Sequence, residues 1–222
     1  MGKLTATIGI ILECSKNLSK PKLANPKSLS EDRVFINLVT ETYNYLKFIA
    51  VILKEKKLKQ SLVLSNLSEL RDRNLPYAEQ MEIIDDIFKS QVSQRLEKYL
   101  KTHEALWISL QLRYEPLSQE ILTTECAEVF SKLHESKMQN RNTVFSTSTE
   151  DVAVGYLDDG YGCGWRYSLC VAAATATAIL CHASCETTAL ATTAGLGIPA
   201  CVALCGTAQV AAGVYCYDKY CK

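Results

Sequence analysis

The chain has 222 residues, and its 24 basic and 24 acidic residues give a formal net charge of zero. This balance excludes a strongly basic nucleic-acid binder, because such a protein needs excess cations to neutralise phosphates, and it argues against an acidic disordered chain. The charges are unevenly placed, since residues 1–150 hold 21 of the basic and 19 of the acidic residues. Eight of the ten cysteines lie after residue 162. We therefore predict a charged domain at 1–145, a linker at 146–162 and a cysteine-rich domain at 163–222.

The sequence predicts few secondary-structure elements before residue 31. Residues 4–12 are rich in β-branched side chains and predict a strand or a short buried segment. The run imitates a signal peptide only weakly, because it is short and no small-residue cleavage site follows it. Ser28 and Glu31 match a capping box, so we expect Ser28 to cap a helix over about 31–59.

Three more elements are predicted between Pro76 and residue 138. Pro76 suits a first helical position, and apolar residues at helical spacing predict one helix over about 76–105. Residues 108–114 alternate apolar and polar side chains, which predicts a short strand. Ser118 then begins a helix to about 138. The expected fold class is mainly α, with room for two or three short strands in the N-terminal domain.

The N-terminal domain offers little catalytic chemistry. Its candidate ligands or nucleophiles are His103, Cys126 and His134, and we interpret them as a buried cysteine and exposed histidines on helix surfaces. The lysines at 54–59 are interpreted as a solvated helix end, with contact to an acidic membrane as the alternative. No phosphate-binding or metalloprotease motif is present in the sequence. We expect neither enzymatic activity nor a bound cofactor.

The C-terminal cysteines form a mirrored ladder. Their successive spacings are 7, 11, 4, 16, 4, 11 and 5 residues. In an α-helix, four residues advance about 40° around the axis and eleven advance about 20° past full turns. One face of a helix therefore carries three of the cysteines, and one face of a second helix carries the mirrored three. These are Cys170, Cys181 and Cys185 on the first helix, and Cys201, Cys205 and Cys216 on the second.

The mirrored order predicts an antiparallel hairpin with specific pairs. Facing residues of such a hairpin have a constant sum of residue numbers, and the sum is 386 for three cysteine pairs and 384 for a fourth. Packed helices bring facing Cα atoms to about 4–6 Å, which a disulfide can bridge. Gly195, Gly197 and Pro199 supply the turn. The predicted disulfides are Cys163–Cys221, Cys170–Cys216, Cys181–Cys205 and Cys185–Cys201.

This hairpin is also nearly free of charge. Residues 167–185 and 187–217 contain no charged side chain, so each stretch is a marginal candidate for a membrane span. Alanine and threonine are weakly hydrophobic, which favours a soluble hairpin. Aromatic residues gather at its open end, where they suit a membrane interface or a core with polar groups directed outward. The membrane-interface candidates are Trp165, Tyr167, Tyr215, Tyr217 and Tyr220.

Residues 170–221 resemble the halocin C-eight type of bacteriocin domain. The resemblance rests on the cysteine layout and the uncharged, alanine- and glycine-rich stretch CVAAATATAILCHASCETTALATTAGLGIPACVALCGTAQVAAGVYCYDKYC. It implies a secreted antimicrobial peptide that proteolysis releases from an upstream segment, which in the prototype of the family is the immunity protein. It implies a processing site within 146–162, and a leader or immunity role for residues 1–145.

The expected partner is the membrane or an envelope receptor of a related target cell, and no nucleic acid. The cysteine density also indicates an oxidising, extracellular destination for the C-terminal domain. Two alternatives stay open. One is a structural or interaction module that does not kill cells. The other is a thiol redox or metal-handling protein, in which the two C-x-x-x-C pairs hold copper or zinc.

Overall fold

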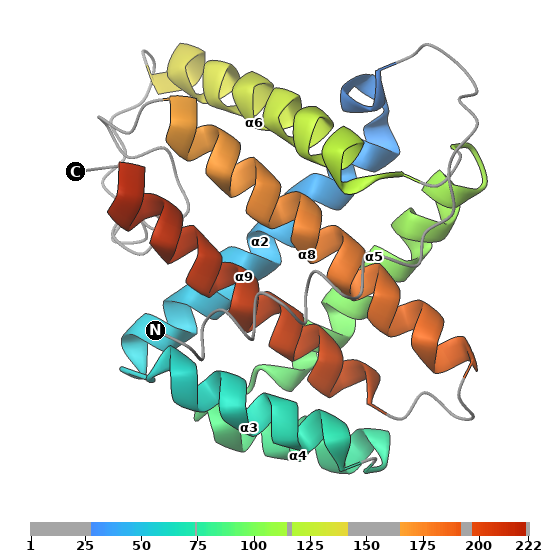
Figure 1. Cartoon of the computed structure of the whole chain (residues 1–222), viewed down its shortest axis with the longest axis vertical. Helices are drawn as coiled ribbons and strands as arrows, with labels where there is room; N and C mark the ends of the chain where they lie inside the picture. The colour runs from blue at the N-terminus through green and yellow to red at the C-terminus, as the bar shows by residue number, and fades with distance from the viewer. Residues whose placement is uncertain (1–27, 74, 115–116, 142–164, 192–196, 221–222) are drawn as a thin grey trace.

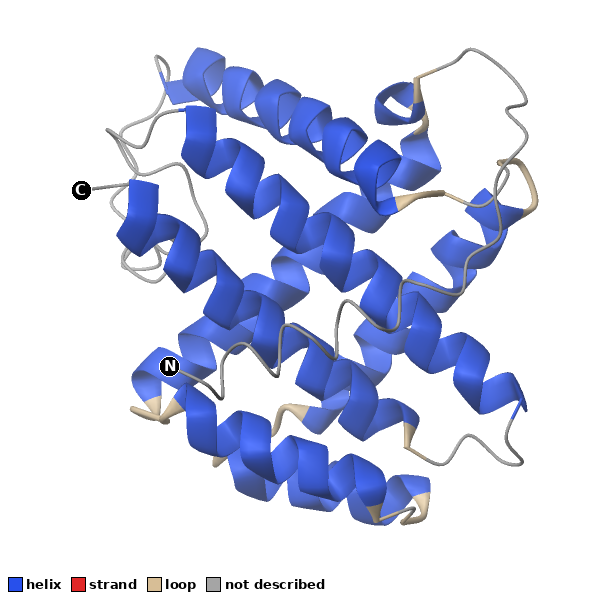
Figure 2. Ribbon diagram, in the orientation of Figure 1, coloured by secondary structure: helices blue, strands red, loops and turns tan. Residues whose placement is uncertain are grey.

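The computed structural model describes residues 28–73, 75–114, 117–141, 165–191 and 197–220. This part of the chain is helical and contains no strand, which confirms the mainly α fold class (Figure 2). The predicted strand at 4–12, the linker at 146–162, and Cys14, Cys163 and Cys221 lie outside the described residues. The helices are η2 (Leu29–Glu31), α2 (Arg33–Glu55), α3 (Gln60–Asp72), α4 (Tyr77–Phe88), α5 (Ser93–Gln111), α6 (Gln119–Arg141), α8 (Trp165–Ala191) and α9 (Ile198–Tyr220).

The predicted capping box at Ser28 is wrong. Ser28 precedes the short η2 turn without capping it through its side chain, and its hydroxyl donates to Glu125 Oε2 of α6 over 2.9 Å. The N-cap of α2 is Asp32, whose Oδ1 accepts a hydrogen bond from the Val34 N–H at 2.7 Å. Asp32 therefore accepts the first-turn N–H hydrogen bond that the sequence analysis assigned to Ser28.

The single helix predicted over 76–105 is two helices. Lys89 adopts a left-handed backbone conformation with φ of 51°, and the Ser90 N–H donates to the Asp85 carbonyl, which ends α4. The Asp85 carboxylate then accepts hydrogen bonds from the N–H and the hydroxyl of Ser93, both at 2.7 Å, at the first turn of α5. This left-handed position usually carries glycine, so a lysine there gave no sequence signal.

The strand predicted over 108–114 is also wrong, because residues 108–111 form the last turn of α5. The apolar alternation there does not mark a buried face. Leu110 is fully buried, whereas Ile108 and Leu112 are 47% and 83% exposed. The predicted helix that begins near Ser118 is present as α6.

The antiparallel pair α8 and α9 lies at the centre of the fold (Figure 1). Helix α6 packs along α8, helices α3 and α4 pack on α9, and α2 crosses behind both helices of the pair (Figure 1). The two main core clusters each contain residues from the pair and from the preceding helices. The charged N-terminal helices and the nearly uncharged hairpin therefore share one hydrophobic interior, whose burial stabilises both.

Candidate functional site: the stapled hairpin and its buried contacts

Three disulfides join α8 to α9, and they are three of the four pairs that the residue-number sum predicts. Cys170–Cys216, Cys181–Cys205 and Cys185–Cys201 have Cα separations of 5.8, 6.0 and 5.9 Å. These separations lie in the range that a disulfide bridges. The fourth predicted pair, Cys163–Cys221, lies outside the described residues. The two helices are therefore held in one register along most of their length.

Small residues let the helices approach this closely. Ala172, Ala176 and Ala203 are fully buried between the hairpin and its neighbours. The turn chemistry matches where it is described, because Gly197 has φ of 94° immediately before α9 and Pro199 lies in the first turn of that helix. Gly195 lies outside the described residues.

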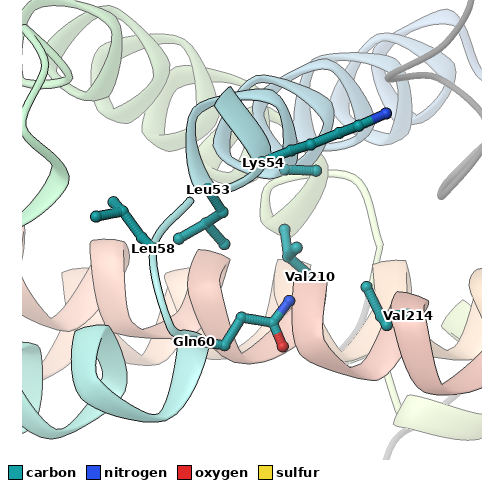
Figure 3. A pocket seen from close by; sticks show the side chains of 7 residues that line it. Leu53, Lys54, Leu58, Gln60, Val210 and Val214 are labelled. Atoms are coloured by element: carbon teal, nitrogen blue, oxygen red, sulfur yellow. The ribbon is translucent and has the colours of Figure 1, made fainter. Parts of the chain in front are cut away.

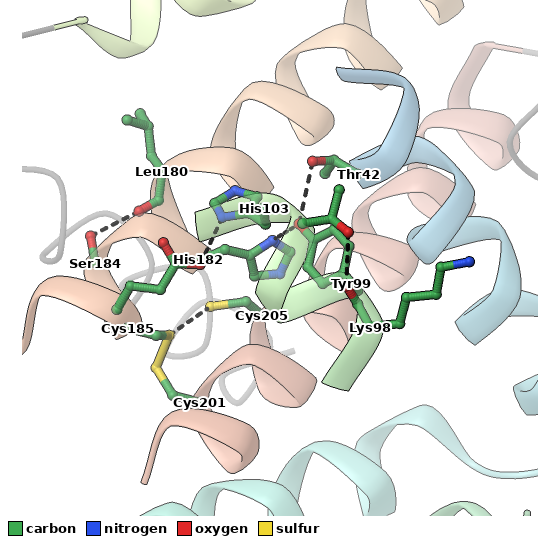
Figure 4. Close-up of polar contacts among 12 residues, drawn as sticks. Thr42, Lys98, Tyr99, His103, Leu180, His182, Ser184, Cys185, Cys201 and Cys205 are labelled. Carbon is green, nitrogen blue, oxygen red and sulfur yellow. Dashed lines mark hydrogen bonds and ion pairs between the residues drawn. A yellow bond between two sulfur atoms is a disulfide. The ribbon is translucent and has the colours of Figure 1, made fainter. Parts of the chain in front are cut away.

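Two of the disulfides lie against each other. The sulfur of Cys185 is 3.7 Å from that of Cys205 (Figure 4). The sulfurs of Cys181, Cys185 and Cys205 all lie within 4.8 Å of one another. As thiolates, these side chains would be soft ligands of the kind that zinc or copper(I) prefers. As disulfides they have no lone thiolate to offer, so the metal alternative requires reduction first. Cys126 is the one cysteine in the described part that is free, and it is fully buried in α6 as expected.

Both hairpin helices meet the length and hydropathy of a membrane span. The stretches Trp165–Glu186 and Ile198–Tyr220 have mean hydropathies of 1.6 and 1.5. In the folded chain, 61% of each of these apolar windows is buried against other residues. The core helices of a soluble protein have the same properties, so composition alone does not separate the two environments.

The aromatic residues at the open end divide into two groups. Trp165 and Tyr215 are 71% and 53% exposed, and the Arg166 and Lys219 side chains lie over their rings. Tyr167, by contrast, is fully buried against Val171 and Cys216, and it meets the Tyr217 ring edge to face at a centroid distance of 6.3 Å. In the folded chain Tyr167 therefore takes the core position that the sequence analysis left open as the alternative, and its contact with a membrane stays a prediction. Trp165, Tyr215 and the partly exposed Tyr220 keep the surface position that the prediction requires.

A buried polar cluster connects α5 to α8 (Figure 4). The phenol of Tyr99 is hydrogen-bonded to His182 Nδ1, and it lies 3.3 Å from the Thr42 hydroxyl of α2. His103 Nδ1 lies 2.8 Å from a carboxylate oxygen of Glu186. In both contacts the residue numbers differ by 83. This constant difference means that α5 and α8 run in the same direction where they cross.

Sequence reasoning missed this cluster. His103 was expected on a helix surface, whereas both it and His182 are 0% exposed. A signal was available. Glu186 is the only charge in an otherwise uncharged stretch of α8, and His182 precedes it by one helical turn, as Tyr99 precedes His103. The side chain of His134, the third histidine, lies outside the described part of the chain.

Burial sets the ionisation of the cluster. Desolvation lowers the pKa of His182 well below its usual value of 6.5, and the nearby His103 lowers it further. The Val202 carbonyl favours the protonated ring, but no hydrogen bond reaches His182 Nε2 in the described residues, and the two opposing effects outweigh it. Desolvation also raises the pKa of Tyr99 well above 10.0. Both pKa shifts favour the neutral forms of the His182 and Tyr99 side chains.

A separate apolar pocket of about 350 Å³ opens where α2 ends over α9 (Figure 3). The Lys54 and Gln60 side chains supply its polar groups. Its lining contains no carboxylate, histidine or cysteine, and Lys54 is its one ionisable side chain. The residues that line it are Ala50, Leu53, Lys54, Leu58, Gln60, Val210 and Val214.

Comparisons of the chain with protein-family models, with curated proteins and with solved structures found no match.

Proposed function

We propose that the chain is the precursor of a secreted antimicrobial peptide of the bacteriocin type. Proteolysis within 146–162 releases the stapled hairpin, which acts on the membrane or envelope of related cells. The preceding helices act as leader or immunity domain. The observation that carries this proposal is the enclosure of two apolar, disulfide-joined helices of membrane-spanning length by charged helices of the same chain.

The packing supports a masking role for the N-terminal helices. Helices α2, α3 and α6 cover the sides of α8 and α9 that would otherwise expose apolar side chains to water. A large exposed apolar surface associates with membranes or with itself. A precursor that keeps this surface covered would protect the producing cell until the hairpin is cut free.

The disulfides support action after release. Three covalent bridges keep α8 and α9 paired without the helices that surround them in the precursor. Each typically contributes about 2–4 kcal/mol by restricting the unfolded chain, although nested loops are not additive. The exposed Trp165 and Tyr215, each beside a basic side chain, give the open end the composition of a membrane interface.

The experiment starts from the folded full chain with a specific protease site inserted within residues 146–162. We expect the cut protein to release dye from anionic liposomes and to inhibit the growth of related cells, and the uncut protein to do neither. Cut protein whose disulfides have been reduced serves as the matched control and should lose activity. Absence of both activities from the cut, oxidised protein would count against the proposal.

The leader and immunity roles are separated by a second measurement. Cells that are sensitive to the cut protein should survive when they express residues 1–145, if these residues bind the hairpin as an immunity protein. Full sensitivity in such cells would leave only the leader role for the N-terminal helices.

The cluster of Cys181, Cys185 and Cys205 favours a thiol redox or metal-handling protein as a second candidate. This function requires free thiols in the native protein. Thiol counting under native conditions distinguishes the two, because fully oxidised C-terminal cysteines exclude a standing metal site. A protein that is oxidised and inactive toward cells would instead support a structural or interaction module.

A further inference from the structure

The buried contacts between α5 and α8 place a titratable imidazole, that of His182, in a dry site that disfavours its charged form. We propose that the Tyr99–His182 contact is an acid-sensitive latch, and that protonation of His182 releases the α8–α9 hairpin from the N-terminal helices. The proposal concerns the docking of the two parts and holds whether or not the released hairpin kills cells.

His182 lies at the interface between the hairpin and the N-terminal helices. The ring is 0% exposed and is surrounded by aromatic rings of the N-terminal helices. The centroids of Tyr99 and His103 of α5 lie 5.0 and 5.4 Å away, and that of Tyr45 of α2 lies 5.8 Å away. His182 is therefore buried by docking, and separation of the hairpin from these helices returns the ring to water.

The hydrogen bonding of the His182 ring depends on its protonation state. A neutral imidazole has one N–H donor and one acceptor, whereas the protonated ring has two donors. Tyr99 occupies Nδ1, while Nε2 has no hydrogen-bond partner among the described residues. In the protonated ring the charge would be buried, which costs free energy, and the Val202 carbonyl offsets only part of that cost.

The groups that face the His182 ring do not balance a positive charge on it. From α5 it faces the phenol of Tyr99 and the imidazole of His103, and from α2 the phenol of Tyr45. Glu186 lies on its own helix, but this carboxylate is hydrogen-bonded to His103. The neighbouring cysteines of α8 and α9 are in disulfides and carry no charge. The carboxylate that could balance a charge on His182 is thus already hydrogen-bonded to His103. A positively charged His103 would repel a positively charged His182.

Linkage then fixes the direction and size of the effect. In the released hairpin, His182 has an ordinary pKa near 6.5, and in the docked state it takes up a proton only at lower pH. Release therefore takes up one proton, and docking weakens about tenfold per pH unit below 6.5. Between pH 7.5 and 5.0 this weakens the complex by up to about 30-fold.

The test uses the full chain, folded and then cut at the protease site inserted within 146–162. Sedimentation or fluorescence anisotropy measures the dissociation constant of the two fragments at pH 7.5 and 5.0. We expect an increase of up to about 30-fold for the native sequence and little change for His182→Gln, which keeps an acceptor for the Tyr99 hydroxyl but does not titrate. His134→Gln, a change of the same kind on α6, should keep the full pH dependence.

Two further outcomes guard against misfolding of the variant. Tyr99→Phe removes the hydrogen bond to His182 but leaves the ring buried, so it should weaken docking at both pH values and keep the native ratio between them. A native complex with the same dissociation constant at both pH values would overturn the latch, as would His182→Gln fragments that retain the native ratio. Fragments that separate in acid without harming cells would support the latch and contradict the proposed function, so the two ideas fail separately.

Discussion

Gly206 of α9 lies directly against the ring of Tyr45 of α2. A Cβ atom at Gly206 would come within 2.6 Å of Tyr45 Cε1 and 3.1 Å of its hydroxyl oxygen. The Tyr45 ring is fully buried and stacks on Tyr99 with centroids 4.2 Å apart, so it has little freedom to move aside. The absence of a side chain at Gly206 thus sets how closely the hairpin approaches the N-terminal helices.

Gly206→Ala tests this contact because two effects oppose each other. Alanine stabilises a helix interior by about 1 kcal/mol relative to glycine, whereas overpacking a core costs about 1–3 kcal/mol. We expect the clash to dominate and the free energy of unfolding to fall, as measured by urea denaturation. In a Tyr45→Leu background the clash is absent, so the same change should raise stability. Stabilisation by Gly206→Ala in the native background would show that Tyr45 yields easily.

The adjacent disulfides predict a rearrangement when one cysteine is removed. In Cys181→Ser, the Cys205 thiolate lies 3.7 Å from Cys185, which is bonded to Cys201. Attack of Cys205 on the Cys185 sulfur forms a Cys185–Cys205 bond, and the Cys201 thiolate leaves. Peptide mapping under non-reducing conditions should therefore find two disulfide isomers.

Cys170→Ser provides the matched control for this rearrangement. Its partner Cys216 belongs to the disulfide nearer the open end of the hairpin, and the two inner disulfides should keep the pairing seen in the structure. A single isomer in Cys181→Ser would mean that the sulfurs of the inner disulfides do not approach each other in solution.

The hairpin could be predicted from sequence because cysteine positions report directly on which residues face each other. The six described cysteines of the hairpin satisfy one residue-number sum, and pairing follows from it without knowledge of the surrounding helices. The open-end aromatics show the limit of this reasoning. Trp165 and Tyr167 are two positions apart and have similar chemistry, but only the packing of α8 decides that Tyr167 is buried.

The N-terminal helices were harder to predict because their signals are local and ambiguous. Lys89 ends α4 in a conformation that the sequence does not mark. Helix α3 received no prediction, since residues 60–72 are largely polar and only Val63, Leu67 and Leu70 are buried. His103 contacts Glu186, 83 positions away, so its burial could be predicted only by comparing the matching one-turn spacings of two distant segments.

Glu186 should be worth far more to stability than an exposed carboxylate in a similar pair. Without the Glu186 carboxylate, His103 Nδ1 is left buried without its partner, and an unsatisfied buried polar group typically costs about 1–3 kcal/mol. Glu186→Ala should therefore lower the free energy of unfolding by about 1–3 kcal/mol, and Glu186→Gln, which retains a hydrogen-bond acceptor, by less.

Glu97→Ala is the control for Glu186→Ala. Glu97 pairs with Lys101 across one turn of α5 at 2.7 Å, but the two side chains are 47% and 75% exposed. Exposed pairs of this type contribute about 0.3–0.5 kcal/mol. Equal effects of Glu186→Ala and Glu97→Ala in urea denaturation would contradict a stabilising buried contact between His103 and Glu186.

Cys126 should be chemically silent in the folded protein. Desolvation raises the pKa of its thiol well above the usual 9.0, and the nearby Glu125 raises it further. The thiolate is the reactive form, so alkylation at pH 8 should be negligible until the chain unfolds. Mass spectrometry after labelling with and without denaturant gives the comparison, and rapid native labelling of Cys126 would show that α6 opens readily.

The stability of the uncut chain should respond to acid in two separate pH ranges. Because the folded pKa of His182 lies below 6.5, its neutral form supports stability above pH 6.5, and this support is lost as the pH falls further. The slope from one such group is about 1.4 kcal/mol per pH unit. For Asp32, burial raises the pKa, but hydrogen bonds from Tyr114 and Val34 and the charge of Arg113 lower it below 3.8 overall. Its stabilisation is therefore present above pH 3.8 and disappears only in stronger acid.

Urea denaturation of the full chain between pH 7.5 and 3 separates these two ranges. His182→Gln should flatten the decline between pH 6.5 and 5, because its side chain takes up no proton there. Asp32→Asn should leave that decline unchanged and reduce the loss below pH 3.8, since the neutral amide does not titrate. If His182→Gln altered only the loss below pH 3.8, the assignment of the upper range to the ring between α5 and α8 would be wrong.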